Sequence, residues 1–278
     1  MRSLLETRDL TIRFGGHVAV DQVSCAFAPG TLTAIVGPNG AGKTTYFNLI
    51  SGQLPASAGR VFLDGEDLTA LPAPLRTRKG LGRAFQLTQL FPHLSVAENV
   101  RLAVQAREQG RGKAGLDLLR VWLDRRSWID EADALLVQVR LADKRDTHAA
   151  ALPHGDQRKL EVALLMALDP KVYMFDEPTA GMSVDEVPVV LDLIRALKAR
   201  RDRTILLVEH KMDVVRELAD RIVVLHNGQL VADGLPAEVI ALPVVQQAYL
   251  GVVGAEAGLP VGQDGSRSPP SLAERGSS

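Results

Sequence analysis

The sequence contains a single cysteine, Cys25, so no disulfide can form within the chain. This usage is typical of a reducing compartment, where thiols stay reduced. We expect Cys25 to serve as a small buried apolar residue, the usual role of a lone free cysteine.

An excess of one charge and long hydrophobic runs are also missing. The 32 basic and 33 acidic residues nearly cancel, which argues against a protein that coats nucleic acid but leaves room for a local basic patch. No apolar run approaches the ~20 residues of a membrane-spanning helix. Charged side chains within residues 1–6 interrupt the apolar run that a signal-peptide core would need. With 278 residues, 46% of them hydrophobic, we expect a soluble globular chain, and any membrane part of its function must come from a partner.

What the sequence does have is a glycine-rich loop between the apolar run 31–36 and the helix-period run 46–51. This phosphate loop reads Gly37-Pro38-Asn39-Gly40-Ala41-Gly42-Lys43-Thr44-Thr45. Its glycines let backbone N–H groups point inward, so that amide donors wrap a triphosphate at a helix N-terminus. Lys43 would reach the β- and γ-phosphates, and the Thr44 hydroxyl would ligate Mg²⁺. The pattern predicts nucleotide binding but no single reaction, because kinases, GTPases and transport motors share it.

Phe14 and Gln86 each lie near the end of a predicted strand, and each has two alternative roles. Residues 4–27 alternate polar and apolar positions around Gly15-Gly16, which predicts antiparallel strands. Phe14 ends the first of them, either as a core aromatic or as a ring that stacks on adenine. Gln86 follows a short strand, where it is either solvated or placed to contact Mg²⁺ or water through its carbonyl.

Two predicted buried strands end in polar side chains. The apolar run 171–175 ends in Asp176 and Glu177, and the run 204–208 ends just before His210. Parallel α/β sheets bind ligands at such ends. Beside a phosphate loop, Asp176 would hold Mg²⁺ and Glu177 would point at the attacking water, the alternative being a solvated strand end. His210 is either a structural histidine or a donor to the γ-phosphate.

Helical patterns occupy the region between these strands. Ser95 and Glu98 form a capping sequence before a first helix, and a second helical region spans 116–139. The next segment runs straight into a further helix and reads Leu152-Pro153-His154-Gly155-Asp156-Gln157. A helix that begins beside glycine is a second potential phosphate-binding terminus. His154 has no second ligand at metal spacing, which argues against a metal site.

Taken in order, these motifs resemble those of the ATP-binding subunits of ABC transporters. The match covers about residues 4–250 and rests on GPNGAGKTT, Gln86, the segment 152–157, FDEPTAGM and the histidine of LLVEH. Within that superfamily the chain is similar to the branched-chain amino-acid importer ATPases. The pointers to that branch are Phe14-Gly15-Gly16, Asn48 and Gly52, AGM after Thr179, the helical insert with Trp122, and Tyr249-Leu250-Gly251.

The resemblance implies an α/β fold with a P-loop NTPase (RecA-like) core, an antiparallel β subdomain and an α-helical signature subdomain at about residues 87–169. The ATP-binding domain would span residues 4–250. Glycine, proline and serine dominate residues 251–278, which we expect to form a disordered tail.

The resemblance also implies a homo- or heterodimer in which each ATP lies between the phosphate loop of one subunit and the signature segment, residues 152–157, of the other. The implied nucleotide contacts are adenine stacking by Phe14 and phosphate binding by residues 37–45. Thr44 and Asp176 would bind Mg²⁺, and Gln86 would contact Mg²⁺ and water. Glu177 would be the general base, and His210 would act as a switch that senses the γ-phosphate.

Four positions, Pro153, His154, Asp156 and Ser183, depart from the family pattern. Where LSGGQ is usual this chain has Leu-Pro-His-Gly-Asp, so Pro153 replaces a serine whose hydroxyl would meet the γ-phosphate. Asp156 adds a negative charge near that site. The aspartate usual in the loop after the strand that carries Asp176 is Ser183 here, which the importer branch tolerates.

The function implied by the resemblance is ATP hydrolysis that energises import of branched-chain amino acids or a related small polar solute, at the cytoplasmic face of the inner membrane. Gln86 and residues 90–93 would contact multipass permease subunits, an extracytoplasmic solute-binding protein would act indirectly, and no nucleic acid would bind.

An export motor of the lipopolysaccharide-exporter kind and a soluble ABC-type ATPase acting on DNA or ribosomes remain alternatives. A phosphotransferase is disfavoured, because no acceptor-binding segment is visible.

Overall fold

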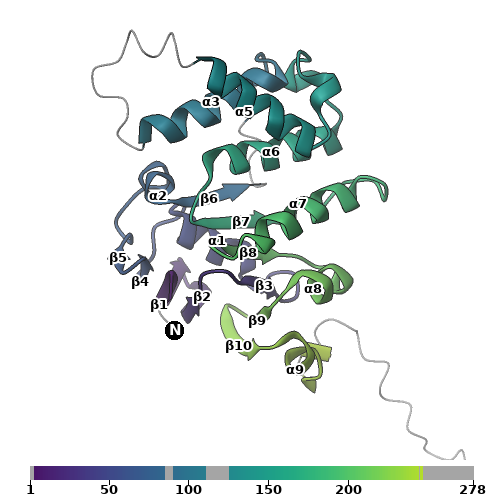
Figure 1. The fold of residues 1–278 in the computed structure, drawn as a ribbon. Coiled ribbons are helices and arrows are strands. Elements are labelled where there is room, and N and C mark those ends of the chain that lie inside the picture. The colour runs from purple at the N-terminus through teal and green to yellow at the C-terminus, as the bar shows by residue number, and fades with distance from the viewer. Residues whose placement is uncertain (1–2, 85–89, 111–124, 244, 247–278) are drawn as a thin grey trace, which may run out of the picture.

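The computed structural model describes residues 3–84, 90–110, 125–243 and 245–246, and Figure 1 shows how they are arranged. The strands are β1 (Leu5–Phe14), β2 (His17–Phe27), β3 (Leu32–Val36), β4 (Ala58–Leu63), β5 (Glu66–Asp67), β6 (Leu81–Ala84), β7 (Val172–Asp176), β8 (Thr204–Val208), β9 (Arg221–His226) and β10 (Gln229–Gly234). The helices are α1 (Lys43–Ser51), α2 (Ala73–Lys79), α3 (Val96–Glu108), α5 (Arg125–Gln138), α6 (His154–Leu168), α7 (Val187–Ala199), α8 (Met212–Leu218) and α9 (Pro236–Ile240), with short 3-10 turns η2 (Ala142–Lys144) and η3 (Ala149–Ala151). Gln86, Trp122 and residues 251–278 lie outside the described residues.

The described strands form two sheets of different kinds. In the larger one, in the order β10-β9-β3-β8-β7-β6, all neighbours are parallel except the antiparallel pair β9 and β10. In the smaller one, in the order β2-β1-β4-β5, all neighbours are antiparallel. The predicted α/β class, with a parallel core sheet and an antiparallel β part, is confirmed.

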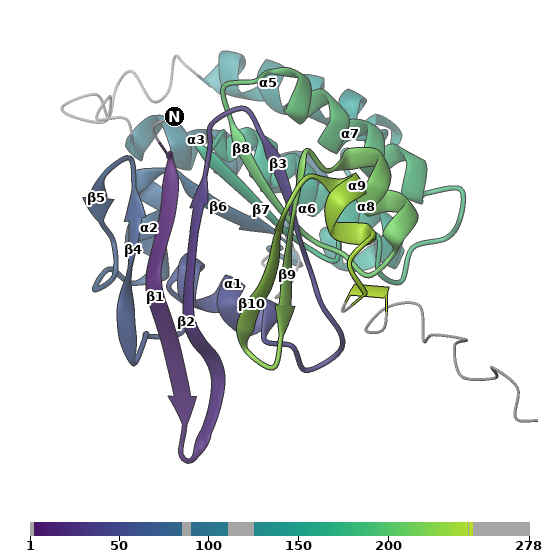
Figure 2. The same cartoon turned by 90° about the horizontal axis from the view of Figure 1, so that it is seen from below.

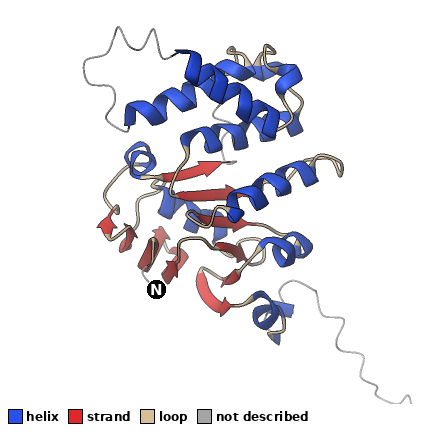
Figure 3. Ribbon diagram, in the orientation of Figure 1, coloured by secondary structure: helices blue, strands red, loops and turns tan. Residues whose placement is uncertain are grey.

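Alternation along the central strands places their side chains in two separate cores. In β7, Tyr173 and Phe175 pack into one buried cluster while Val172 and Met174 pack into another. Successive side chains of a strand point to opposite faces, so a wholly apolar strand has to be covered on both sides. Helices α3, α5, α6 and α7 supply the cover on one face, as Figure 3 shows, and α1 supplies it on the other.

Helix α1, which follows the phosphate loop, lies between the two sheets (Figure 2). Tyr46 and Phe47 are fully buried in a cluster that also contains side chains of β1, β2 and β4 on one side and of β3, β7 and β8 on the other. The Tyr46 hydroxyl lies 2.7 Å from Thr7 Oγ1. Cys25 belongs to the same cluster, as predicted, and its burial raises the pKa of the thiol to about 11. The phosphate loop therefore has a rigid base.

Arg76 of α2 closes the far end of α1. It is only 2% exposed, and its guanidinium donates to the carbonyl oxygens of Leu49 and Ile50, each at 2.7 Å. It also donates to the carbonyl oxygens of Leu71 and Thr69, each at 2.8 Å. The last carbonyls of a helix lack intrahelical partners, and a cation beside them also meets the negative end of the helix dipole.

We expect Arg76→Met to lower the free energy of unfolding by about 3 kcal/mol, because buried carbonyl oxygens lose their donor. Chemical denaturation of the nucleotide-free chain measures this loss. Arg78→Met, at an exposed position of the same helix, is the matched control and should cost less than about 0.5 kcal/mol. Equal losses in the two variants would contradict the role of Arg76.

The helical layer begins with the predicted capping box. The Ser95 hydroxyl accepts from the Glu98 N–H at 3.2 Å, and the Glu98 carboxylate accepts from the Ser95 N–H at 2.8 Å. The helix that follows, α3, packs on α5 and α6 through Val96, Val100 and Val104, which are fully buried. Within the described ranges no helix combines the length and apolar character that crossing a membrane requires.

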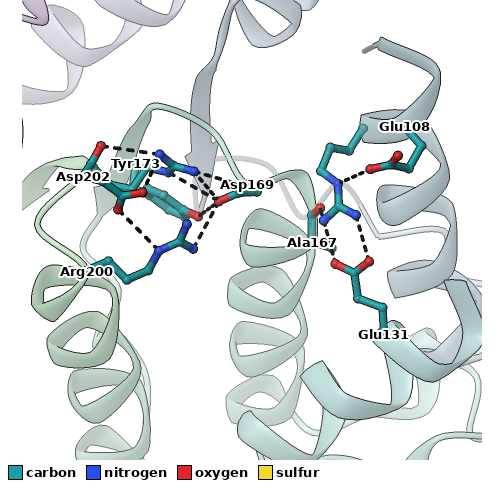
Figure 4. Close-up of polar contacts among 9 residues, drawn as sticks. Glu108, Glu131, Ala167, Asp169, Tyr173, Arg200 and Asp202 are labelled. Atoms are coloured by element: carbon teal, nitrogen blue, oxygen red, sulfur yellow. Dashed lines mark hydrogen bonds and ion pairs between the residues drawn. The ribbon is translucent and has the colours of Figure 1, made fainter. Parts of the chain in front are cut away.

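Three arginines contact the C-terminal end of α6, and Figure 4 shows one of them, Arg200, beside Asp169, with which it forms an ion pair at 3.2 Å. On one side, Arg107 of α3 donates to the Glu131 carboxylate of α5 at 2.6 and 2.8 Å and to the Ala167 carbonyl at 3.1 Å. On the other side, Asp169 accepts from Arg203, next to β8, with both oxygens at 3.1 Å. Helix α6 is thus joined to the helical layer and to the parallel sheet at the same end.

Candidate functional site

The carboxyl ends of β3, β8, β7 and β6 lie side by side at one edge of the larger sheet. The register pairs Val208 with both Ile35 and Asp176, and it pairs Ala84 with Phe175. Polar residues that follow these strands therefore come together although they are distant in sequence. Parallel α/β sheets bind their ligands at this edge.

The phosphate loop leaves β3 at this edge and packs closely on neighbouring backbone. A Cβ on Gly37 would lie 2.1 Å from the Leu225 carbonyl oxygen. One on Gly42, whose φ is 95°, would lie 2.5 Å from the carbonyl oxygen of Ala19. Neither position has room for a side chain, which explains why the loop needs glycine there.

The Lys43 side chain folds back against the phosphate loop. Its Nζ donates to the carbonyl oxygens of Gly37 at 2.6 Å and of Pro38 at 2.9 Å. Burial lowers the pKa of Lys43, and the carboxylates of Glu177 and Asp176 oppose that shift. The cation is therefore positioned at the place where the loop would receive phosphate oxygens.

Asp176, the last residue of β7, is a buried carboxylate with a cationic partner. It is 5% exposed, and Arg83 of β6 donates to its Oδ2 at 2.7 Å. Burial raises the pKa of Asp176, and the Arg83 guanidinium opposes that shift. Thr44 of the phosphate loop is half-buried in the first turn of α1. Carboxylate and hydroxyl oxygens suit Mg²⁺, so the two side chains fit that ion.

Glu177 and His210 contact each other at the ends of β7 and β8. Glu177 Oε1 lies 2.5 Å from His210 Nε2, and both side chains are partly exposed. The backbone of Glu177 has φ 52°, in the left-handed region that residues with a Cβ rarely adopt, and its N–H donates to the Val208 carbonyl at 2.9 Å. Such backbone geometry is retained where the surrounding structure enforces it, and functional sites are enriched in it.

Glu209 belongs to this group although the sequence analysis did not single it out. It is 3% exposed, and its carboxylate accepts from the Thr179 hydroxyl at 2.6 Å and from the His210 N–H at 3.0 Å. It thereby joins the turn after β7 to the end of β8. Arg83 was missed as well, and in both cases the available signal was a charged residue within or directly after an apolar strand.

Phe14, the last residue of β1, is 50% exposed. The core-aromatic alternative for this residue is therefore wrong. An exposed ring at the end of a strand is free to stack on a flat ligand, so adenine stacking stays a prediction.

The signature segment forms the start of α6. Pro153 is the N-cap residue, and the Gln157 side chain donates to the Leu152 carbonyl at 3.0 Å across the first turn. The Glu186 carboxylate lies close to Gly155, where an added Cβ would be 2.1 Å from Glu186 Oε1. Negative charge is favoured at a helix N-terminus.

Asp156, which was expected to add a negative charge near the γ-phosphate, has cationic partners within the chain. Asp156 is 4% exposed, and its carboxylate bonds to the ammonium groups of Lys144 and, at 2.8 Å, of Lys159. Burial favours a raised pKa, but the two lysine hydrogen bonds outweigh it and hold the pKa of Asp156 below its usual value. Two cations of the same chain therefore compensate this carboxylate.

The phosphate loop and the signature segment share no polar contact within one chain. In the part of the chain that the structure describes, no hydrogen bond or ion pair joins residues 37–45 to residues 152–157. The two segments also pack into different buried clusters, Ala41 into one and Leu152 into the other.

Comparison with known proteins connects this geometry to one family. The model of the ABC transporter family matches residues 20–180. The branched-chain amino acid transport ATP-binding protein BraF of Pseudomonas aeruginosa is 37% identical over 251 residues, which cover 90% of this chain and 98% of BraF. The lipopolysaccharide export system ATP-binding protein LptB of Acidithiobacillus ferridurans is 34% identical, with 90% of this chain and 98% of LptB covered.

A solved structure agrees in fold as well. The ADP conformation of an ATP-binding cassette of an ABC transporter superimposes with a TM-score of 0.74 and 28% identity, covering 91% of this chain and 100% of the other. Sequence and fold therefore agree over nearly the whole chain. The chain belongs to the ABC transporter family and is an ATPase of that family.

Proposed function

We propose that this chain is the ATP-hydrolysing subunit of an ABC importer for branched-chain amino acids or a related small polar solute. The observation that supports this most is that the chain has two potential phosphate-binding helix starts, the phosphate loop and the signature segment, which share no polar contact. One triphosphate would touch both kinds of helix start when a second subunit, identical or paralogous, supplies its α6. Binding of ATP would then close a pair of subunits.

In this proposal each nucleotide has contacts from both subunits. The exposed ring of Phe14 stacks on adenine, and the N–H groups of residues 37–45 surround the phosphates. Lys43 exchanges the carbonyls that now hold it for phosphate oxygens, which are stronger acceptors because they are charged. Residues 152–157 of the second subunit bind the γ-phosphate from the opposite side.

Mg²⁺ would be held by the Thr44 hydroxyl and the Asp176 carboxylate, with Gln86, which lies outside the described residues, as a further ligand. When bound, the ion neutralises charge on the phosphates. The oxygen chemistry of Thr44 and Asp176 supports this assignment.

Glu177 is proposed as the general base that accepts a proton from the attacking water, and His210 as a donor to the γ-phosphate. The 2.5 Å contact between these two side chains supports a shared role at the ends of β7 and β8. Once the γ-phosphate has been cleaved, the contact shared by the two subunits is lost and the pair reopens.

The proposed solute class comes from relatives such as BraF, whose name specifies branched-chain amino acid transport. Export of lipopolysaccharide is a second candidate, since LptB is also similar, with 34% identity. A role on DNA or ribosomes is disfavoured because the net charge is only -1. We place the chain at the cytoplasmic face of the inner membrane, with residues 4–250 as the ATP-binding domain and about 87–169 as its signature subdomain.

A groove beside the helical layer supports docking of a permease subunit. A cavity of about 420 Å³ lies between the end of β6, α3 and α6, with Phe91, Asn99 and Leu165 in its lining. Phe91 is 56% exposed, and buried Asn99 accepts from the Phe91 N–H at 2.8 Å and donates to its carbonyl at 3.1 Å. The structure thus fixes an apolar ring at the surface, which is the kind of anchor that a membrane partner would bury.

The proposal is tested by expressing the chain with its genomic neighbours and purifying the assembly. We expect multipass permease subunits to co-purify and the solute-loaded binding protein to stimulate hydrolysis. Phe91→Asp should reduce permease recovery at least about tenfold, because a charge replaces a buried apolar anchor, while ATP binding is unchanged. Val137→Asp, at a 65% exposed position of α5, is the matched control.

Recovery of ribosomes or nucleic acid in place of permeases would contradict the transport role. Stimulation by a lipopolysaccharide-loaded membrane complex instead of a solute-binding protein would favour the export alternative. Normal permease recovery with Phe91→Asp would contradict only the docking surface.

A further inference from the structure

Arg83 connects the two elements that carry the proposed magnesium ligands. It lies on β6, and its guanidinium is 6% exposed. One terminal nitrogen, Nη2, donates to Asp176 Oδ2 at 2.7 Å. The other, Nη1, donates to Asn48 Oδ1 at 2.6 Å and to Ser51 Oγ at 3.0 Å, both on α1. A single rigid, planar group therefore bridges β7 and α1.

The distance between α1 and β7 matters for Mg²⁺ binding, because each element carries one of the proposed ligands. Thr44 lies in the first turn of the helix α1, Asn48 and Ser51 lie further along the same helix, and Asp176 is the last residue of β7. Because a helix is stiff over this length, the distance from Arg83 to α1 also constrains where the Thr44 hydroxyl lies relative to the Asp176 carboxylate. Mg²⁺ demands nearly ideal octahedral geometry, so its affinity is sensitive to this spacing.

Contact through one carboxylate oxygen has a second consequence. Arg83 engages Oδ2 of Asp176, which orients the carboxylate while Oδ1 stays outside that contact. Partners that orient metal ligands from behind contribute to metal affinity although they never touch the metal. A buried arginine is also a costly way to gain stability alone, because apolar residues of similar volume serve at least as well.

We propose that Arg83 is a positioning residue that sets the affinity of the site for Mg²⁺, by fixing the spacing between α1 and Asp176 and the orientation of the Asp176 carboxylate. The inference rests on the proposed assignment of Asp176 and Thr44 as magnesium ligands. It predicts an effect on the magnesium-dependent part of nucleotide binding and little effect on the magnesium-free part.

The test titrates a fluorescent ATP analogue onto the full chain in EDTA and then at increasing Mg²⁺. Arg83→Gln should raise the Mg²⁺ concentration for half-maximal enhancement of binding about 10-fold or more, the size expected when a ligand's supporting partner is lost. Affinity in EDTA should stay within about twofold of the parent chain, because the phosphate loop is intact. Arg60→Gln, at an exposed position of β4, is the matched control.

Two further variants test whether Arg83 acts by joining α1 to Asp176 or only by placing a positive charge beside Asp176. Arg83→Lys keeps the charge but lacks the planar fork, so its magnesium midpoint should remain at least about threefold above that of the parent. The pair Asn48→Ala and Ser51→Ala removes acceptors on α1 and leaves the contact with Asp176, and it should also shift the midpoint about threefold. These two variants decide the question if melting temperatures show that Arg83→Gln is unfolded.

An unchanged magnesium midpoint in Arg83→Gln, or a midpoint fully restored by Arg83→Lys, would overturn the inference. Equal losses in EDTA and in Mg²⁺ would do the same, because they would indicate a general structural role. Asp176→Asn separates this failure from failure of the proposed function. If Asp176→Asn leaves the midpoint unchanged, the magnesium assignment itself is wrong; if it abolishes the enhancement while Arg83 variants do not, only the role of Arg83 is wrong.

Discussion

Glu177→Gln should keep ATP binding, stabilise the closed pair of subunits and cut turnover by at least ~100-fold. The amide has the shape of the carboxylate but cannot accept a proton from water. The backbone of Glu177 is anchored by its hydrogen bond to the Val208 carbonyl and has φ 52°, so the substituted side chain should point in the same direction. ATP then stays bound and uncleaved, and the closed state accumulates.

Phosphate release measures turnover, and light scattering with Mg-ATP measures pairing, both with and without the membrane partners. The matched control is Asp213→Asn, which neutralises an exposed carboxylate in the first turn of α8, near His210, and should hydrolyse ATP at the parental rate. Turnover near the parental value in Glu177→Gln would remove this residue from the role of base. A chain that remains strictly monomeric under all these conditions would contradict the shared nucleotide site.

Lys43→Met should weaken binding of Mg-ATP by about 100-fold, because a charge-assisted hydrogen bond to phosphate is worth up to about 3 kcal/mol. Methionine fills most of the volume that the lysine stem occupies. Loss of the Lys43 ammonium also removes the donor that bonds to the carbonyls of Gly37 and Pro38. The phosphate loop should therefore lose both its cation and part of its order.

Equilibrium titration with a fluorescent ATP analogue measures this affinity, and a melting curve confirms that the variant is folded. Lys79→Met provides the comparison, since Lys79 forms only a surface ion pair with Glu66 and such pairs contribute little. Affinity of Lys43→Met within threefold of the parent would mean that the backbone of the loop, not the lysine, supplies most of the phosphate binding.

Much of the site could be predicted from local sequence. The phosphate loop needs glycines and a lysine at fixed offsets, and these occur within nine consecutive residues, from Gly37 to Thr45. The apolar run that ends in Asp176 and Glu177 predicts a buried strand with its polar end at a ligand-binding edge, because parallel sheets are covered on both faces. The Ser95 and Glu98 capping box was predictable for the same reason, since both partners lie within one helical turn.

The interactions that tune the site were not predictable in this way. The contact of Arg83 with Asp176 joins positions 93 residues apart, and that of Thr179 with Glu209 joins positions 30 residues apart. Neither pair leaves a local pattern, because the partners meet only when β6, β7 and β8 align in one sheet. The lysines around Asp156 were missed for a similar reason: Lys144 belongs to a separate turn that packs beside α6.

The amino-acid sequence by itself determined the class of fold, the nucleotide-binding loop and the family, because each depends on residue types at short, fixed spacings. Only the tertiary structure decided which charged groups are paired, that the ring of Phe14 is exposed, and that the phosphate loop and the signature segment pack into different buried clusters. Pairing, exposure and separation depend on distances between elements, and those distances are set by how the sheets and helices pack around two hydrophobic cores.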